Sequence, residues 1–311
     1  MFNVAMIGAW HVHAKGYAKE LSETENVKVV AVYDENQSLA DSWAKELGCE
    51  AKSLEAILAD ETIHGIALCT ATNEHTAILV RACEAKKAIF TEKVLTLSNE
   101  DALRVAKAVK ENGVRFTISF PHKCNPLLRK AKEMVEEGIL GDVTYARVRN
   151  VHNGSVADWL PAHFYNPVQC GGGAMIDLGA HPMYTLIWFL GKPTHVQSLF
   201  TNVTDRPVED NAVSLLSFPN GAIGVSETGF VSTDNPYTME VSGTKGALMI
   251  HGDTLRASVE GEWKEITDLP QKIPSPVVQW GMGIDNDAFS IDQAVALTEV
   301  MVMAYQSHAS H

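Results

Sequence analysis

Short apolar runs alternate with helix-like polar stretches over the first 120 residues. Phe2–Ile7, Val27–Tyr33 and Gly65–Cys69 are continuous enough in apolar residues to be buried strands. Further strands are predicted at Ala88–Phe90 and Val114–Ser119. Helical patterns separate them, at 14–23, 43–47, 54–58, 75–85 and from Ser98 to Asn112. Strand after helix after strand predicts an α/β domain over residues 1–120, built on a doubly wound parallel sheet.

The pattern changes after residue 120. A helix at 126–137 and a strand at Val143–Val151 are followed, beyond another helix ending at Leu190, by strand-like runs at 196–203, 212–218, 222–230, 237–242 and 247–251. The turn Pro219-Asn220-Gly221 is a strong hairpin signal. Residues 121–311 are therefore predicted to form a second, α+β domain with a large open, mostly antiparallel sheet. A final helix over Asp285–Ser307 is expected to return to the first domain.

The first strand, helix and second strand make a βαβ unit of nucleotide-binding length. Gly8 ends the first strand and Asp34 ends the second. A carboxylate at this place accepts hydrogen bonds from both ribose hydroxyls and repels a 2′-phosphate, which favours NAD and leaves NADP as the alternative. An N-cap role for Asp34 in the following helix is equally open.

The turn after the first strand reads Gly8-Ala9-Trp10-His11-Val12-His13 and keeps only the first glycine of G-x-G-x-x-G. Trp10 and His13 replace the glycines that let backbone approach a pyrophosphate and let helix pack on strand. Two histidines at alternate positions also have a zinc interpretation. We expect no metal site, with one histidine near a cofactor and the other at the helix start.

Other polar residues follow buried strands at the edge where ligands bind in such sheets. Thr70–Asn73 follow one strand, and Glu92-Lys93 follow the next. A lysine at a strand end is usually a solvated surface residue, but at this edge a functional role is favoured.

Two stretches of the second half carry candidate chemistry. The loop around His152–Asn166 combines aromatic and polar side chains, as substrate pockets do, although it could equally be packed on its own aromatics. Gly171–Gly173 allow close backbone approach, and Asp177 and His181 stand four apart, on one face if the segment is helical. Such a pair is either a general-base unit or an exposed helix pair.

Composition narrows the classes of function. A net charge of −13 and the lack of a basic run argue against nucleic-acid or anionic-membrane partners. Five scattered cysteines suit reduced thiols in a cytoplasm, and no signal peptide or membrane span is visible. An open antiparallel sheet needs a cover, so a homo-oligomer, dimer or tetramer, is expected through the second domain.

Taken together, these motifs resemble the Gfo/Idh/MocA family of NAD(P)-dependent oxidoreductases, which act largely on sugars and cyclitols. The resemblance covers nearly the whole chain and depends most on Glu92-Lys93 and on Gly171–His181. It implies an N-terminal Rossmann domain and a C-terminal α/β domain with a large open sheet. The implied cofactor-binding residues are Gly8, Trp10, His11, Asp34, Thr70, Thr72, Asn73, His75 and Glu92. The expected substrate-binding residues are His152, Trp159, His163 and Tyr165.

The resemblance also implies catalytic roles. Lys93 matches the lysine at the reacting oxygen, His181 the acid/base histidine, and Asp177 the carboxylate beside it. This chain departs from the family pattern in the Gly8 turn, in Val94, which replaces the proline of Glu-Lys-Pro, and in Tyr184, which stands where the family often has an acidic residue. A non-proline residue makes a cis bond costly, by about 3 kcal/mol, so the orientation of Lys93 is open.

The leading functional hypothesis is a dehydrogenase or reductase for a polyol, sugar or cyclitol. A second hypothesis keeps the nicotinamide bound and uses transient oxidation for elimination or epimerisation. A third is a non-catalytic nucleotide- or sugar-binding regulator. A fourth is a metal-dependent hydrolase using His11, His13, His152 or His163.

Overall fold

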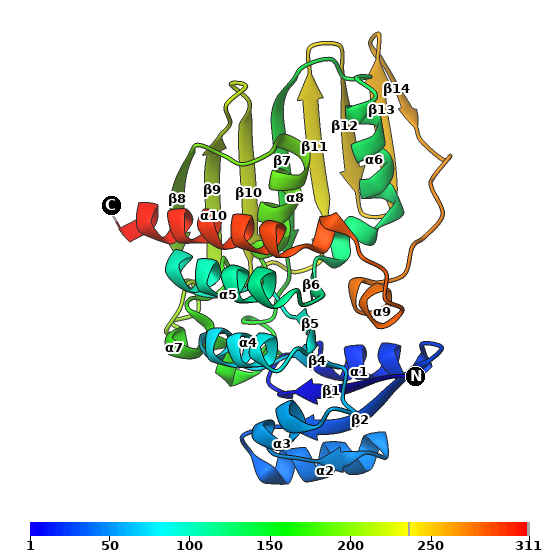
Figure 1. Ribbon diagram of the computed structural model, residues 1–311. Helices are drawn as coiled ribbons and strands as arrows, with labels where there is room; N and C mark the ends of the chain where they lie inside the picture. The colour runs from blue at the N-terminus through cyan, green and yellow to red at the C-terminus, as the bar shows by residue number, and fades with distance from the viewer. Residues whose placement is uncertain (236, 310–311) are drawn as a thin grey trace. The chain divides into compact units, whose positions relative to one another are not determined.

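The computed structural model describes residues 1–235 and 237–309 (Figure 1). The chain divides into two compact units. Unit 1 contains residues 1–119 and 274–298, and unit 2 contains residues 120–273 and the chain from Glu299 onwards. The last helix, α10 (Ile291–Ala309), therefore begins in unit 1 and ends in unit 2.

Unit 1 is built on a six-stranded sheet in the order β3-β2-β1-β4-β5-β6. Every pairing in it is parallel, which confirms the predicted doubly wound sheet. The strands are β1 (Phe2–Ile7), β2 (Val27–Tyr33), β3 (Glu50–Ala51), β4 (Gly65–Leu68), β5 (Ala88–Thr91) and β6 (Phe116–Ile118). The helices are α1 (Ala14–Glu23), α2 (Gln37–Leu47), α3 (Leu54–Ala59), η1 (Thr72–Glu74), α4 (His75–Glu84), α5 (Asn99–Asn112), α9 (Pro276–Gly281) and η4 (Asp287–Phe289).

Local signals in the sequence explain the helix ends of unit 1. Ser98 caps α5 by accepting the backbone N–H of Asp101, and Gly113 ends it in the left-handed conformation. Helix α2 begins earlier than predicted, at Gln37 rather than Trp43. Asn36 is its cap and accepts the N–H groups of two residues in the first turn. An N-cap role for Asp34 is therefore wrong.

The core of unit 1 also includes residues from far along the chain. The ring of Trp280 on α9 packs edge-on against Phe2, with 5.3 Å between ring centroids, and lies 6.0 Å from Phe90. No pattern in the sequence predicted α9, because a six-residue helix shows too little periodicity.

Unit 2 contains an eight-stranded sheet in the order β14-β13-β12-β11-β7-β10-β9-β8. Only β7 and β10 pair in parallel, so the sheet is mostly antiparallel, as predicted. Its strands are β7 (Val143–Val151), β8 (His195–Thr201), β9 (Asn211–Ser217), β10 (Ile223–Gly229), β11 (Thr238–Gly243), β12 (Gly246–His251), β13 (Thr254–Val259) and β14 (Glu262–Glu265). The helices are η2 (Pro121–Cys124), α6 (Pro126–Glu136), η3 (Ala162–Tyr165), α7 (Pro167–Cys170) and α8 (Ala180–Leu190).

The sheet of unit 2 is covered on one face. Helix α8 packs on β7 and β10, and α6 packs on β12 and β13 (Figure 1). Along β8 and β9 every second residue is buried, so the other face is exposed. The last strands, β13 and β14, were not predicted. The four residues of β14 are all exposed and show no apolar alternation.

The glycine stretch packs against unit 2 itself. A Cβ on Gly172 would lie 1.9 Å from the hydroxyl oxygen of Tyr305, and one on Gly173 would lie 2.0 Å from the carbonyl oxygen of Glu209. The Tyr305 hydroxyl donates to the Glu209 carboxylate at 2.6 Å, and the same carboxylate oxygen accepts the N–H groups of Gly173 and Met175. These glycines therefore allow close packing of backbone on a buried hydrogen-bond network.

No helix among residues 1–235 and 237–309 has the length and apolar character needed to cross a membrane.

Candidate active site

The turn after β1 is held by close packing at Gly8. Its φ of +82° suits glycine, and a Cβ there would lie 2.5 Å from the side chain of Thr70. The backbone N–H of Gly8 donates to the carbonyl of Tyr33, and that of His11 donates to the carbonyl of Cys69. The turn is thus fixed to the ends of both neighbouring strands, and only glycine fits its first position.

Asp34 joins this turn to the end of β2. One carboxylate oxygen accepts the N–H of Ala9 at 2.8 Å, and the other accepts the N–H of Asn36 at 2.9 Å. A carboxylate oxygen has two acceptor sites, so both oxygens keep capacity for a ligand hydroxyl. The side chain is half-buried at the carboxyl edge of the sheet, where the sequence predicted it.

The segment after β4 turns through the short helix η1 into α4. Thr70 is buried, Thr72 is half-buried and Asn73 is exposed. His75 is 1% exposed, and its two ring nitrogens lie 3.1 Å and 3.3 Å from the carbonyl oxygens of Leu95 and Thr70. Burial lowers the pKa of His75 and so favours the neutral ring, which can donate its one N–H to only one of these two carbonyl oxygens. The geometry is that of a residue that positions the turn.

Glu92 lies at the centre of a buried polar cluster at the end of β5. Its carboxylate lies 2.8 Å from Nδ1 of His13 and 3.4 Å from Nδ1 of His11. The hydroxyl of Tyr17 donates to the same oxygen, and the backbone N–H of Lys93 donates to the other at 2.9 Å. Burial alone would raise the pKa of Glu92, but His11, His13 and Lys93 outweigh it and hold this pKa well below its ordinary value.

Lys93 is itself 5% exposed, so it is no solvated surface residue. The Lys93–Val94 peptide bond is cis. The burial of Lys93 was not visible in the sequence.

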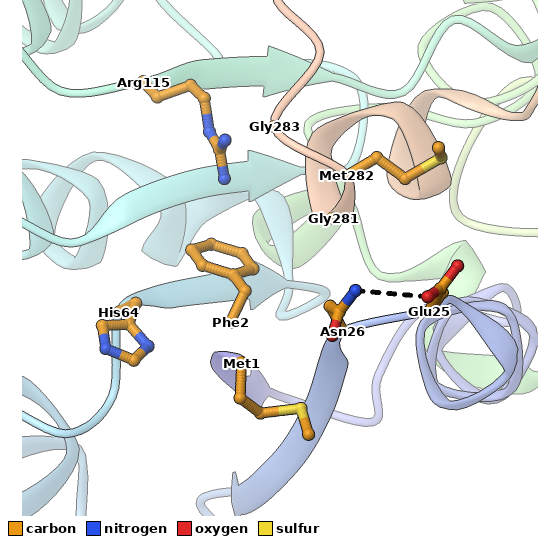
Figure 2. A pocket seen from close by; sticks show the side chains of 9 residues that line it. All are labelled: Met1, Phe2, Glu25, Asn26, His64, Arg115, Gly281, Met282 and Gly283. Atoms are coloured by element: carbon orange, nitrogen blue, oxygen red, sulfur yellow. Dashed lines mark hydrogen bonds between the residues drawn. The ribbon is translucent and has the colours of Figure 1, made fainter.

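An open cavity of unit 1 lies at the opposite edge of the sheet. Figure 2 shows its lining, which includes Phe2, His64 and Arg115 near the amino ends of β1, β4 and β6. The guanidinium of Arg115 stands over the ring of Phe2, 4.8 Å from its centroid. Ligands of such sheets bind at the carboxyl edge, so this cavity is separate from the candidate site.

In unit 2, His181 is buried in the first turn of α8. Its Nδ1 lies 2.9 Å from the hydroxyl of Tyr184, which also accepts the backbone N–H of His122 at 3.1 Å. The rings of His181 and His122 stack with 4.6 Å between centroids and 19° between planes. Tyr184 thus orients the imidazole from the position where the family often has an acidic residue. His122 was missed, although it follows β6 at the ligand edge.

The helical pairing expected for Asp177 and His181 is wrong. Helix α8 begins at Ala180, and Asp177 lies in the turn before it, its N–H bonded to the carbonyl of Gly173. Gly179 is the N-cap residue of α8 and packs closely on the preceding turn, since a Cβ there would lie 2.5 Å from the carbonyl oxygen of Met175. The i, i+4 geometry therefore does not apply to this pair.

The loop after β7 is packed largely on its own aromatic rings. His152 stacks on Phe230 with 4.9 Å between centroids, and Trp159 lies against the same imidazole at 4.7 Å. Trp159 is 52% exposed, whereas Tyr165 is 4% exposed and bonds to Ser155 through its hydroxyl. His163 is half-buried and its carbonyl accepts from the Cys170 thiol. Trp159 is exposed, and His152 and His163 are half-buried, so these three members of the predicted set leave side-chain surface for a ligand, whereas Tyr165 is buried.

Family models identify the protein class. Residues 2–120 match the model described as "Oxidoreductase family, NAD-binding Rossmann fold", and residues 128–249 match the GFO/IDH/MocA C-terminal domain. The chain belongs to the Gfo/Idh/MocA family and is an NAD-dependent oxidoreductase.

Three similar proteins are 19–29% identical to this chain over the residues that match. The scyllo-inositol 2-dehydrogenase (NAD(+)) of Bacillus subtilis (strain 168) is 29% identical over 252 residues, which cover 77% of this chain and 70% of the relative. The 2,7-anhydro-N-acetylneuraminate hydratase of Escherichia coli (strain K12) is 24% identical over 262 residues, covering 80% and 68%. A solved structure of levoglucosan dehydrogenase, in complex with NADH and levoglucosan, superposes with a TM-score of 0.88 at 19% identity, covering 99% and 97%.

The residues of unit 1 fit a dinucleotide. Gly8 has the backbone conformation and the close strand packing of the first glycine of such turns, and Asp34 offers carboxylate oxygens at the end of β2. The half-buried Trp10 stands at the second glycine position, and His13 stands at the third, where it begins α1. The departures thus change the side chains of the turn and leave its first glycine and carboxylate in place.

Proposed function

We propose that this protein oxidises a secondary alcohol of a sugar, polyol or cyclitol, or reduces the matching ketone, with His181 as acid/base and Lys93 at the substrate oxygen. NAD, when bound, accepts or supplies the hydride. The observation that carries the proposal is the buried His181 imidazole, held on Nδ1 by Tyr184. It occurs in a chain whose first 120 residues match an NAD-binding oxidoreductase model.

His181 is proposed to move the hydroxyl proton. With hydrogen on Nδ1, the ring donates to Tyr184, and the basic lone pair lies on Nε2. Tyr184 cannot turn freely, because its oxygen also accepts the N–H of His122. The stacked ring of His122 adds a flat contact that restricts the imidazole plane. A fixed base within reach of its proton contributes about 10²–10⁴-fold to a rate.

Lys93 is proposed to stabilise negative charge on the substrate oxygen. Its ammonium group is buried, so its field is less screened than that of a surface lysine. The backbone N–H of Lys93 is anchored on the Glu92 carboxylate, which fixes the chain at this position. Asp177 is proposed to contact substrate from the turn before α8.

Cofactor preference is proposed to depend on Asp34, whose charge would repel a 2′-phosphate. Its carboxylate is already anchored by the N–H groups of Ala9 and Asn36, so its place at the ribose is set before a nucleotide binds. We therefore expect NAD to bind more tightly than NADP. The further cofactor contacts proposed are Trp10, His11, Thr70, Thr72, Asn73, His75 and Glu92.

Substrate class is inferred from the relatives, whose names include inositol and levoglucosan dehydrogenases. The loop side chains proposed to contact the substrate are His152, Trp159 and His163. The buried Tyr165, also predicted to bind the substrate, is proposed to shape the loop through its hydroxyl bond to Ser155. A relative named as a hydratase favours one second candidate, in which bound NAD takes part in elimination with no net redox change.

The test is a screen of polyols, cyclitols and anhydrosugars with NAD and NADP, following both NADH formation and substrate loss. We expect His181→Gln to lower kcat about 100-fold or more, and Lys93→Met to lower it by a similar factor. His195→Gln, an exposed substitution on β8, is the matched control and should leave kcat unchanged. Substrate loss without NADH would establish the elimination reaction instead. A turnover unchanged by His181→Gln would refute the assigned role, and nucleotide binding with no turnover of any compound would favour a regulator.

A homo-oligomer, dimer or tetramer, is proposed through the exposed face of the eight-stranded sheet. Large apolar side chains gather there on adjacent strands, including Leu199, Val213 and Leu215, which are 40–68% exposed. Leu199 stands opposite Val213 in the register of β8 and β9. Sedimentation of the wild type and a Leu199→Glu/Leu215→Glu variant tests the proposal, and an unchanged mass for the variant would contradict it.

A further inference from the structure

A second chemical feature of unit 1 is the group formed by His11, His13 and Glu92. The two histidines come from the turn between β1 and α1, and Glu92 comes from the end of β5. Their ligand atoms all lie within 4.8 Å of one another. The rings of His11 and His13 are 4.6 Å apart, and Nδ1 of His11 accepts the backbone N–H of His13 at 3.3 Å. Two imidazoles and a carboxylate thus converge on one point.

The spacing of these atoms suits a small divalent ion. Two ligands of a tetrahedral zinc with bonds of about 2.1 Å stand about 3.4 Å apart. Nδ1 of His11 lies 3.4 Å from the Glu92 oxygen, and Nδ1 of His13 lies 2.8 Å from it. The second pair needs to open by roughly half an ångström, which a side chain 44% exposed, as His13 is, can do by rotation. Binding through Nδ1 of His11 would also displace the 3.3 Å hydrogen bond that this atom accepts from the backbone N–H of His13, because the nitrogen has one lone pair.

The surroundings of Glu92 orient it as a ligand. The backbone N–H of Lys93 fixes one oxygen, and the Tyr17 hydroxyl donates to the oxygen that faces the histidines. Tyr17 is in turn 2.7 Å from the hydroxyl of Ser119. Hydrogen-bonded carboxylates of this kind are typical of metal sites.

We propose that His11, His13 and Glu92 bind one zinc ion, with the remaining coordination position open to water. Two nitrogen donors and one carboxylate are the ligand set of several three-residue zinc sites, and such donors do not suit magnesium or calcium. His13 gives the site its contact with solvent, since the other two side chains are 5% and 1% exposed.

The zinc site shares His11 and Glu92 with the cofactor contacts proposed above, but its test follows zinc binding alone, so the two proposals can fail separately. Lys93 follows Glu92 directly in the chain and is buried, so it is a nearby positive charge that opposes the ion. Removing that charge should therefore tighten zinc binding, whereas removing a ligand should abolish it.

The experiment is equilibrium dialysis of the full chain, stripped of metal by chelation, against zinc alone, with cobalt(II) as the spectroscopic probe. We expect one zinc per chain, and cobalt bands of a four-coordinate nitrogen and oxygen site without a thiolate charge-transfer band. His13→Ala should weaken binding about 100-fold or more, and Tyr17→Phe about tenfold. His13 is the primary variant because it is partly exposed, so its loss leaves the fold intact.

His308→Ala is the matched control, because this histidine packs on Phe200 in unit 2 and should not matter. Lys93→Met should raise the zinc affinity several-fold, whereas an adventitious surface ion would not respond to it. Absence of zinc binding by the wild type, equal binding by His13→Ala, or a thiolate band in the cobalt spectrum would each overturn the proposal.

Discussion

The buried lysine of unit 2 offers the most quantitative test of the structure. Lys123 is 3% exposed, with its ammonium group over the rings of Phe120 and Trp188 at 5.1 Å and 5.9 Å. Burial, with a smaller contribution from the charge of Lys132, lowers its pKa from 10.5 to about 7. The perturbation is Lys123→Met, which keeps the length and most of the volume of the side chain and removes the charge.

The magnitude follows from the pKa. A fall from 10.5 to about 7 corresponds to about 5 kcal/mol, at roughly 1.4 kcal/mol per pKa unit. The unfolded lysine binds its proton below about pH 10.5, whereas the folded one binds it only below about pH 7. As the pH falls from about 10.5 to about 7, Lys123 therefore makes the free energy of unfolding progressively smaller. The methionine variant lacks the penalty and should be about 3–5 kcal/mol more stable at pH 7, after subtraction of the cation–π attraction that a methionine cannot make.

The assay is urea denaturation of wild type and variant at pH 7 and pH 10, comparing free energies of unfolding. The advantage of Lys123→Met should shrink to under about 1 kcal/mol at pH 10. Lys130→Met is the control: its ammonium group bonds to Asp268 at 2.7 Å, so its small effect, within about 1 kcal/mol, should not shrink over this range. A variant less stable than the wild type at both pH values, or a difference independent of pH, would refute the reasoning.

Two further predictions concern side chains and glycines around the candidate site. Tyr184→Phe removes the hydroxyl that contacts Nδ1 of His181. We expect kcat to fall about tenfold, a loss of roughly 1.4 kcal/mol, and the pH profile of kcat to shift. An unchanged profile would show that Tyr184 does not tune the base. Gly172→Ala places a methyl group against Tyr305 and should destabilise the protein by about 3 kcal/mol or more, which would appear as a lower Tm. Gly16→Ala is the control, because Gly16 has open space around it in α1, and it should raise Tm slightly. Equal effects of the two substitutions would contradict the close packing of Gly172 on Tyr305.

The sequence predicted the elements that carry strong local signals. Strand β2 and helix α1 have the predicted bounds, because their apolar positions follow one period without interruption. The short α9 and the exposed β14 escaped prediction, since neither has enough periodic apolar residues. Asp177 was assigned to a helix because spacing alone does not reveal that Gly179 packs on Met175.

In the candidate site, too, some features could be predicted from the sequence and others could not. The chemical groups, Asp34, Glu92, Lys93 and His181, could be chosen from the sequence because each follows a strand end or a glycine stretch. Their partners could not, because a contact such as that between Tyr17 and Glu92 joins residues 75 positions apart. The domain boundary near residue 120 and the catalytic roles stay predictions.

What the sequence determined by itself was the alternation of strands and helices, the glycine at the first turn and the family of the chain. These depend on local periodicity and backbone conformation, which neighbouring residues set. Only the tertiary structure decided that Glu92 lies between two histidines, that Tyr184 holds His181, and that Lys123 is buried. Burial and pKa depend on which distant side chains the fold brings together, and no local pattern in the sequence records that.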